Sequence, residues 1–329
     1  MNDSPLYRTT VQSASFQSTE DSKRTILAHD PDALARSLTN WNQCYDQMSC
    51  DRFEGGLVES RVGRLQVFRE SISQAVYQTC RVWPDAIWFG FPQHESATRI
   101  NGRPAAPATV LLQQGDSEFE LVTPSAYTIY GIVVPRDLLI DVSCRLQVEL
   151  DWDALGNAEM LSLDNPQRAA FLDMLAAQLG LQAGEQQSQD ALVSALVSLL
   201  DHGQPDAAVT RSLKRRQQVI DKVRDYVLAN RDQPVSIPDL CAHTHTSRRT
   251  LQYCFEDILG VSPVNYLRIL RLNGARRELL GAGNARRQIG EVASAWGYGT
   301  FSQFSCDYRK LFGEPASATL RKTATCAAC

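Results

Sequence analysis

The sequence predicts an α+β protein with a β-rich N-terminal domain and flanking helices, followed by an all-α domain. Short apolar and aromatic runs broken by Gly and Pro fill residues 53–134, a texture typical of strands. Residues 211–322 instead show helical periods, and they contain two copies of one helix-turn-helix pattern, at 237–260 and 289–313. The length of 329 residues also favours more than one domain.

Composition and periodicity set the expected boundaries. Residues 1–25 are polar and rich in Ser, Thr and Gln, which predicts a disordered N-terminal tail. The β-rich domain is expected over residues 26–205, the helical domain over 211–322 and a C-terminal tail over 323–329. The sequence HGQPDAA at 202–208 predicts a linker.

Within the N-terminal domain, Leu34, Leu38, Trp41 and Tyr45 recur at spacings of four, three and four, which predicts a helix over residues 27–47. The apolar runs from 53 to 134 indicate an antiparallel sheet, rolled or sandwiched. Two amphipathic helices follow between residues 153 and 201. Their apolar stripes are expected to pack on the chain's own sheet, with homodimer formation as the alternative.

Charge is distributed unevenly between the two domains. Residues 1–210 carry 14 Lys and Arg against 27 Asp and Glu, a net charge of -13. Residues 211–329 carry 19 against 10, a net charge of +9. The basic charge therefore coincides with the repeated motif, where it would attract a polyanion.

The first repeat presents the chemistry that DNA reading requires. Ser247 is expected to cap its second helix, in which Leu251, Phe255 and Ile258 face inward. The residues turned outward are Arg248, Arg249, Gln252 and Tyr253. Arg can donate two hydrogen bonds to guanine and Gln can pair with adenine, and the first turns of such a helix enter the major groove. We expect this helix to read base sequence.

A long helix from Pro263 to Leu280 is predicted to join the repeats, with Ser262 as its N-cap. At about 1.5 Å per residue it spans roughly 27 Å, near one turn of DNA. Four of its arginines are expected to face solvent or phosphate: Arg268, Arg271, Arg276 and Arg277.

The second repeat has a different outward face. Its turn is expected at residues 296–298 and its N-cap at Thr300, with a core of Phe304, Tyr308, Leu311 and Phe312. The outward residues are Phe301, Ser302, Ser305, Cys306 and Arg309. This set has fewer groove-reading donors than the first, so we expect it mainly to hold the DNA.

The string IGEVASAWGYGTFSQFSCDYRKLFGEPA, with the order of helices before it, resembles the C-terminal domain of AraC/XylS-type transcription regulators over residues 213–321. The resemblance implies binding to promoter DNA, contact with RNA polymerase and activation of transcription. It assigns base contacts to Arg249, Gln252 and Tyr253, and to Phe301, Ser302 and Cys306. The family often has Arg or Lys where Cys306 stands.

The N-terminal strings VFRES (67–71), IWFGFP (87–92) and TPSAYTIYGIVVP (123–135) are similar to those of the ethanolamine-operon regulators within this family. The resemblance implies a cupin-like sensor domain with ethanolamine and adenosylcobalamin as effectors, and no required cofactor. A small ammonium ligand is usually held by a carboxylate and aromatic faces. The candidate effector-binding residues are Trp88, Phe89, Phe91, Glu118, Glu120, Tyr127 and Tyr130.

Other function classes find less support in the sequence. A cupin-like enzyme with a DNA-binding tail would need two or three converging histidines, and residues 53–134 contain only His94. No Ser/His/Asp set is suggested either, so catalysis is not expected. The C-x-x-C of Cys326 and Cys329 lacks a second ligand pair, so no metal or redox site is expected. A DNA-binding adaptor whose N-terminal domain binds a protein stays open. No apolar run is long enough for a membrane span, which predicts a cytoplasmic location.

Overall fold

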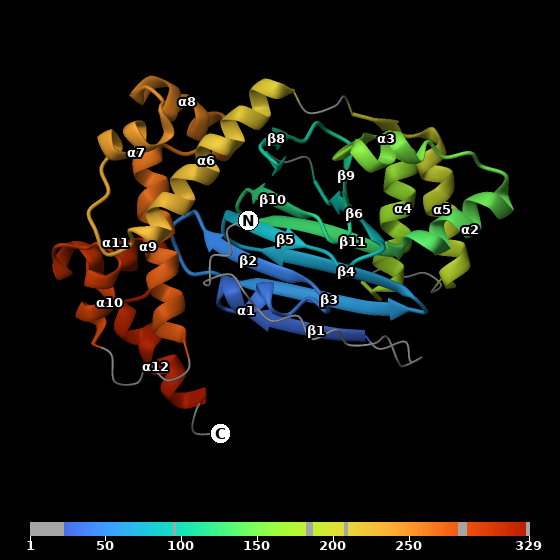
Figure 1. Ribbon diagram of the computed structural model, residues 1–329. Coiled ribbons are helices and arrows are strands. Elements are labelled where there is room, and N and C mark those ends of the chain that lie inside the picture. The colour runs from blue at the N-terminus through green and yellow to red at the C-terminus, as the bar shows by residue number, and fades with distance from the viewer. Residues whose placement is uncertain (1–22, 95–96, 182–186, 207–209, 282–287, 327–329) are drawn as a thin grey trace.

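The computed structural model describes residues 23–94, 97–181, 187–206, 210–281 and 288–326. It consists of a β-rich N-terminal domain and a helical C-terminal domain that pack against each other (Figure 1). None of the helices in the described part of the chain is long and apolar enough to cross a membrane.

The N-terminal domain contains two antiparallel sheets within the described residues. Sheet A has the order β1-β3-β4-β11-β6-β9-β12-β13, with bounds Lys23–Ala28, Gly55–Val62, Leu65–Ile72, Tyr127–Pro135, Ala86–Pro92, Thr109–Gln114, Met160–Ser162 and Gln204–Pro205. Sheet B has the order β2-β5-β10-β7-β8, with bounds Asn42–Gln47, Val76–Arg81, Glu118–Thr123, Arg99–Ile100 and Arg103–Pro104. The prediction of an antiparallel, rolled or sandwiched β domain is confirmed, while a specifically cupin-like roll stays a prediction.

Sheet A is covered on both faces. Because side chains alternate along a strand, its residues divide between two apolar cores. Phe89, Ile132 and Val134 point toward the helices, whereas Trp88, Ile129 and Val133 point toward sheet B. This two-sided burial explains why β6 and β11 have near-continuous apolar sequences rather than an alternating pattern.

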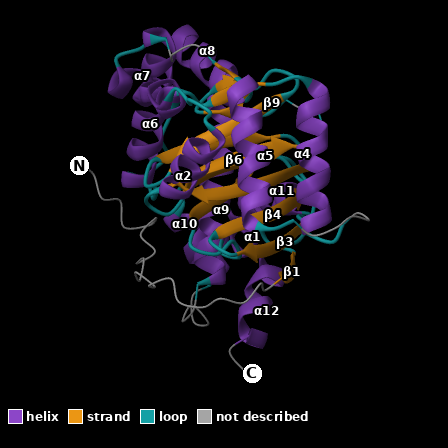
Figure 2. Cartoon of the chain, turned by 90° about the vertical axis from the view of Figure 1, so that its right-hand side faces the viewer, coloured by secondary structure: helices purple, strands orange, loops and turns teal. Residues whose placement is uncertain are grey.

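Helices α2, α4 and α5 lie over the outer face of sheet A (Figure 2). Their bounds are Arg136–Leu146, Asn165–Gln178 and Gln189–His202, and the short α3 covers Trp152–Asn157. Phe171, Leu175, Leu192 and Leu196 are buried against the sheet. The expectation that these stripes pack on the chain's own sheet is confirmed.

The helix predicted over residues 27–47 is wrong. Strand β1 extends to Ala28, α1 covers only Pro31–Ala35, and β2 begins at Asn42. Leu34, Leu38 and Tyr45 are all buried, but they lie in α1, in the turn after it and in β2, so their spacing does not mark one helix face. The tail boundary also changes, since residues 23–25 belong to β1; residues 1–22 lie outside the described part.

The first helix of the helical domain begins at Arg211, and its last helix extends to Cys326, past the boundary predicted at residue 322. The domain comprises α6 (Arg211–Ala229), α7 (Ile237–Thr244), α8 (Arg248–Leu259), α9 (Pro263–Leu280), α10 (Ile289–Ala295), α11 (Phe301–Phe312) and α12 (Ala316–Cys326). Ser247 and Ser262 cap α8 and α9 by accepting a backbone N–H, as expected. Thr300 precedes α11 as its N-cap residue but makes no side-chain capping bond. The side chain of Cys326 and residues 327–329 lie outside the described part.

Candidate DNA-binding interface and sensor cavity

The outward face of α8 forms at the beginning of the helix. Leu251, Phe255 and Ile258 are fully buried beneath it, which fixes the helix orientation. Arg248 and Arg249 are exposed in its first turn, and the side-chain amide of Gln252 donates to Glu256 over 2.5 Å. The structure thus brings the four predicted residues of this unit onto one exposed surface. Gln252 would have to exchange Glu256 for a base edge on binding DNA.

Tyr253, 54% exposed, is held by a residue that the sequence did not point to. Arg216 of α6 donates to the Tyr253 hydroxyl over 3.1 Å and lies 5.5 Å from its ring centroid. Its guanidinium also pairs with Asp257 of α8 over 3.3 Å. Arg216 therefore holds the tyrosine ring in position on the exposed face of α8.

The outward face of α11 is hollowed. The hollow has a volume of about 670 Å³. Its lining includes four of the predicted residues, Phe301, Ser305, Cys306 and Arg309, together with Lys310. Ser302 is exposed nearby on the same helix. Phe301 is 55% exposed, which is unusual for a large apolar side chain. Lys310 was missed because the α11 pattern assigned its position no role.

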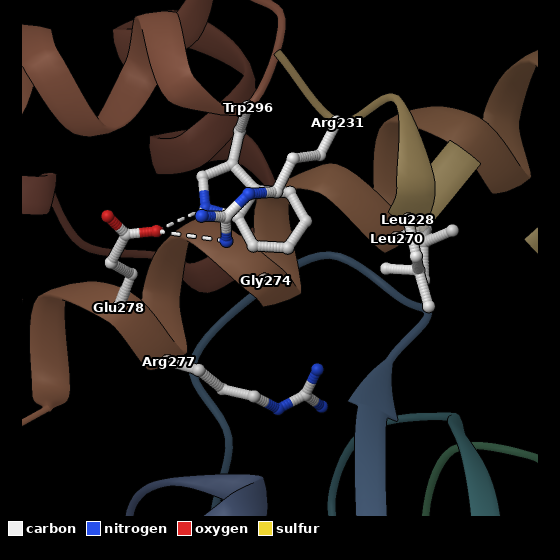
Figure 3. Close-up of a pocket in the computed structure, with 7 residues that line it drawn as sticks. All are labelled: Leu228, Arg231, Leu270, Gly274, Arg277, Glu278 and Trp296. Atoms are coloured by element: carbon white, nitrogen blue, oxygen red, sulfur yellow. Dashed lines mark hydrogen bonds and ion pairs between the residues drawn. The ribbon is translucent and has the colours of Figure 1, made fainter. Parts of the chain in front are cut away.

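The second helix-turn-helix unit meets α6 and α9 at a pocket of about 280 Å³, to which it contributes Trp296 (Figure 3). The Trp296 indole N–H donates to Glu278 over 2.9 Å, and the Arg231 guanidinium lies 5.3 Å from the indole centroid. Gly274 allows the Trp296 ring to pack directly on α9, because an added Cβ would lie 2.0 Å from the indole. The junction fixes the second unit on α9.

Two arginines of α9 are not available to phosphate, contrary to expectation. Arg276 is 4% exposed and pairs with Asp30 over 2.7 Å and with Glu314 over 3.0 Å. Arg277 pairs with Asp32 and Asp46. Burial of a charge requires a partner. The acidic N-terminal domain supplies Asp30, Asp32 and Asp46, while Glu314 comes from the helical domain itself. Arg271 donates to a backbone carbonyl, whereas Arg268 is about 42% exposed.

Helix α6 also contacts the N-terminal domain. Arg224 donates to Glu120 over 2.7 Å and to the Tyr77 hydroxyl, and Gln217 donates to Glu120. These contacts border a cavity of about 380 Å³ between β10 and α6. Burial, with the nearby Glu120 carboxylate, raises the pKa of Asp221 in this cavity to about 6.

The seven predicted effector-binding residues do not converge on one site. Trp88 and Tyr127 point between the two sheets. Phe89, Phe91 and Tyr130 lie on the opposite face of sheet A, against the helices. Glu118 and Glu120 share one face of β10, as expected, but that face borders α6. The division follows from the strand period of two, which sends neighbouring aromatic residues to opposite faces.

The structure contains a different candidate cavity, between the sheets. It has a volume of about 20 Å³, and the residues lining it include Trp41, Tyr45, Phe68, Glu70, Trp88 and Tyr127. Trp41 stands edge-on to Phe68 and Trp88, with ring centroids 5.7 and 5.8 Å away. The buried Trp88 Nε1 has no hydrogen-bond acceptor among the described residues. Aromatic faces around a carboxylate are suited to an organic cation.

Glu70 supplies the carboxyl group of this cavity. Its carboxylate accepts from the Tyr45 hydroxyl over 2.8 Å. Burial disfavours the ionised form and raises its pKa to about 7, while the Tyr45 hydrogen bond acts in the opposite direction. Glu70 lies in the VFRES string, where alternation from Phe68 could have indicated its inward direction.

Comparison with known proteins supports the assignment of the helical domain. Residues 240–322 match a family model described as a helix-turn-helix domain. The chain thus carries a helix-turn-helix domain. It is 26% identical over 190 residues to the probable thc operon regulatory protein of Rhodococcus erythropolis. It is 33% identical over 103 residues to the HTH-type transcriptional regulator GbdR of Pseudomonas aeruginosa.

These relatives are regulatory proteins, not enzymes. The first match covers 58% of this chain and 54% of the thc operon protein. The second covers 31% of this chain and 27% of GbdR. Among solved structures, an AraC-type regulator from Chromobacterium violaceum is 27% identical over 34% of this chain and 95% of its own, with a TM-score of 0.30. The AraC-like activator CuxR is 16% identical over 83% of this chain and 100% of its own, with a TM-score of 0.39.

Proposed function

We propose that the whole chain is a sequence-specific, effector-responsive regulator of transcription that binds promoter DNA. The observation that carries the proposal is the exposed α8 face, on which Arg248, Arg249 and Gln252 stand in the first turns of a recognition helix. The second unit lies at the other end of α9, so two adjacent major-groove segments are the expected target. Activation and contact with RNA polymerase follow from the family resemblance.

The test is selection of upstream genomic fragments by the full-length chain at moderate salt. The expected result is enrichment of a short sequence that the double variant Arg249→Ala/Gln252→Ala no longer discriminates. Ser37→Ala, in the N-terminal domain, serves as a control and should enrich the same sequence as the wild type. Equal binding of selected and random DNA by the wild-type chain would contradict the proposal.

We infer that the effector is a small organic cation held in the cavity between the sheets. Glu70, together with the aromatic rings of Trp41 and Trp88, supports this ligand class. Ethanolamine belongs to the class and is the ligand that the sequence resemblance suggests. Adenosylcobalamin rests on the resemblance alone and is far larger than the roughly 20 Å³ cavity. The alternatives are that the N-terminal domain binds a different metabolite or a protein partner.

Calorimetric titration of the full-length chain with ethanolamine tests the effector proposal. Binding should be lost or strongly weakened in Glu70→Gln, because the carboxylate supplies the countercharge. It should persist in Glu118→Gln, whose carboxylate lies on the outer face of β10. Binding that depends on Glu118 and not on Glu70 would move the effector to the cavity between β10 and α6.

A further inference from the structure

Sheet B lies between sheet A and the helical domain (Figure 1). One of its faces lines the proposed effector cavity, and the other packs on the helical domain. Its three neighbouring strands β2, β5 and β10 each place adjacent residues on the two sides. On the cavity side lie Tyr45, Gln78 and Leu121. On the other side lie Asp46, Tyr77 and Glu120, which contact α9 or α6.

Among the contacts on the outer side are three pairs of residues that we term the latch: Arg224–Glu120, Arg277–Asp46 and Asn273–Gln47. Arg277 donates to Asp46 over 2.6 Å and also to the backbone carbonyl of Tyr45, a cavity residue, over 2.9 Å. The backbone N–H of Gln47 donates to the side-chain oxygen of Asn273 over 2.9 Å. The side-chain NH₂ of Asn273 donates in return to the backbone carbonyl of Gln47 over 3.0 Å. The backbone of β2 is therefore fixed directly to α9.

The cavity on the inner side is too small for a ligand in this arrangement. Its volume of about 20 Å³ suits about one water molecule. Trp88, which lines it, is itself held by stacking on Phe119 of β10, with ring centroids 5.2 Å apart. Ethanolamine has four non-hydrogen atoms, so it requires several times this space. Packed interiors do not yield such space without displacement of their walls.

We propose that effector binding and latch closure oppose each other through sheet B, an inference that rests on the effector cavity proposed above. A ligand enlarges the cavity by displacing β2 and β10, and the same displacement separates Asp46 and Glu120 from their arginines. The ligand thus binds the unlatched form better and shifts the protein toward it. By linkage, opening the latch by mutation must tighten ligand binding.

The first experiment compares ethanolamine affinity among full-length variants by calorimetry. Arg224→Gln and Asn273→Ala, which weaken the latch from α6 and α9 respectively, should each lower Kd about five-fold or more. Arg64→Gln removes an equal charge from an exposed pair with Asp137 and should leave Kd unchanged. Equal Kd values in the wild type and both latch variants would overturn the coupling while leaving the effector cavity intact.

A second experiment needs no ligand and decides the case if ethanolamine binds none of these proteins. Leu121→Phe places a larger side chain in the cavity from sheet B. Leu112→Phe places the same larger side chain in the core under the helices. Hydrogen exchange at the Gln47 amide should accelerate in Leu121→Phe but not in Leu112→Phe. Unchanged or equal exchange in the two variants overturns the coupling, whereas absence of ethanolamine binding alone contradicts only the proposed effector.

Discussion

At the scale of single residues, the arginines of the helical domain have opposite roles despite their identical charge. Arg249 is exposed at the beginning of α8, whereas Arg276 is 4% exposed among Asp30, Glu314 and the Phe312 ring. The first can approach a base edge, and the second stabilises a buried acidic contact. Burial and partners, rather than net charge, separate the proposed DNA contact Arg249 from the structural arginine Arg276.

Arg249→Ala should reduce affinity for the selected operator by about 1–3 kcal/mol and relax discrimination at one base pair. The reason is loss of a bidentate donor to a base edge. Quantitative binding to operators altered one base pair at a time measures both effects. Lys310→Ala is the comparison, because a phosphate contact should weaken specific and random DNA alike and reduce the salt slope by about one. An Arg249 variant with that second pattern would make Arg249 a phosphate contact.

Glu70 should make the stability of the protein depend on pH. Its pKa is about 7 in the fold against 4.5 for the free group, so the folded protein binds more protons than the unfolded chain between these values. The stabilisation present below pH 4.5 is therefore lost as pH rises through about 7. Glu70→Gln should gain about 2–3 kcal/mol relative to the wild type between pH 5 and pH 8.

Urea unfolding of both proteins at the two pH values measures this difference. Asp239→Asn provides the control, because hydrogen bonds from Ser236 lower the pKa of Asp239 below its usual 3.8. A lowered pKa affects stability only as pH falls through that lower range, so the effect of this variant should be the same at pH 5 and pH 8. A pH-independent effect of Glu70→Gln would show that Glu70 stays ionised.

At the scale of elements, the sequence predicted the helical domain well because its signals were local. Ser262 and Pro263 mark the beginning of α9, and the period of Leu251, Phe255 and Ile258 marks the buried face of α8. The helix predicted over residues 27–47 was wrong because apolar residues of β1, α1 and β2 all belong to one buried core, which gave them a helix-like spacing. The cavity around Glu70 could not be predicted from the sequence either, because its walls come from strands far apart in the chain.

Gly274 shows how an element junction can override local propensity. Ala is normally preferred to Gly inside a helix by about 1 kcal/mol, but a Cβ at Gly274 would lie 2.0 Å from Trp296. Gly274→Ala should therefore destabilise the helical domain by about 1–3 kcal/mol, as overpacked cores do. Gly290→Ala in α10 has no atom within 4 Å of the added Cβ and should be neutral or stabilising. Thermal unfolding of the two variants compares them, and a stabilised Gly274→Ala would contradict the tight junction in Figure 3.

At the scale of the whole molecule, the charge asymmetry contributes to domain contact as well as to DNA attraction. The N-terminal region carries a net charge of -13 and the C-terminal region +9, and part of both is neutralised where Asp32, Asp46 and Glu120 meet α9 and α6. Tyr77 and Val122 of sheet B also pack into the core of the first helix-turn-helix unit. The interface is thus partly apolar and partly ionic, which favours joint unfolding of the two domains.

Calorimetric unfolding should accordingly give one transition for the wild type and two for Arg224→Gln/Asn273→Ala. Removal of Arg224 leaves Glu120 buried without its cation, and removal of the Asn273 amide leaves the Gln47 backbone without its partners, so the interface loses stability while each domain keeps its own core. Arg64→Gln, with the same charge change outside the interface, should retain one transition. Two transitions in the wild type would mean that the domains are already thermodynamically independent. A single transition in the double variant would mean that Tyr77, Val122 and the remaining Arg276 and Arg277 pairs suffice to couple them.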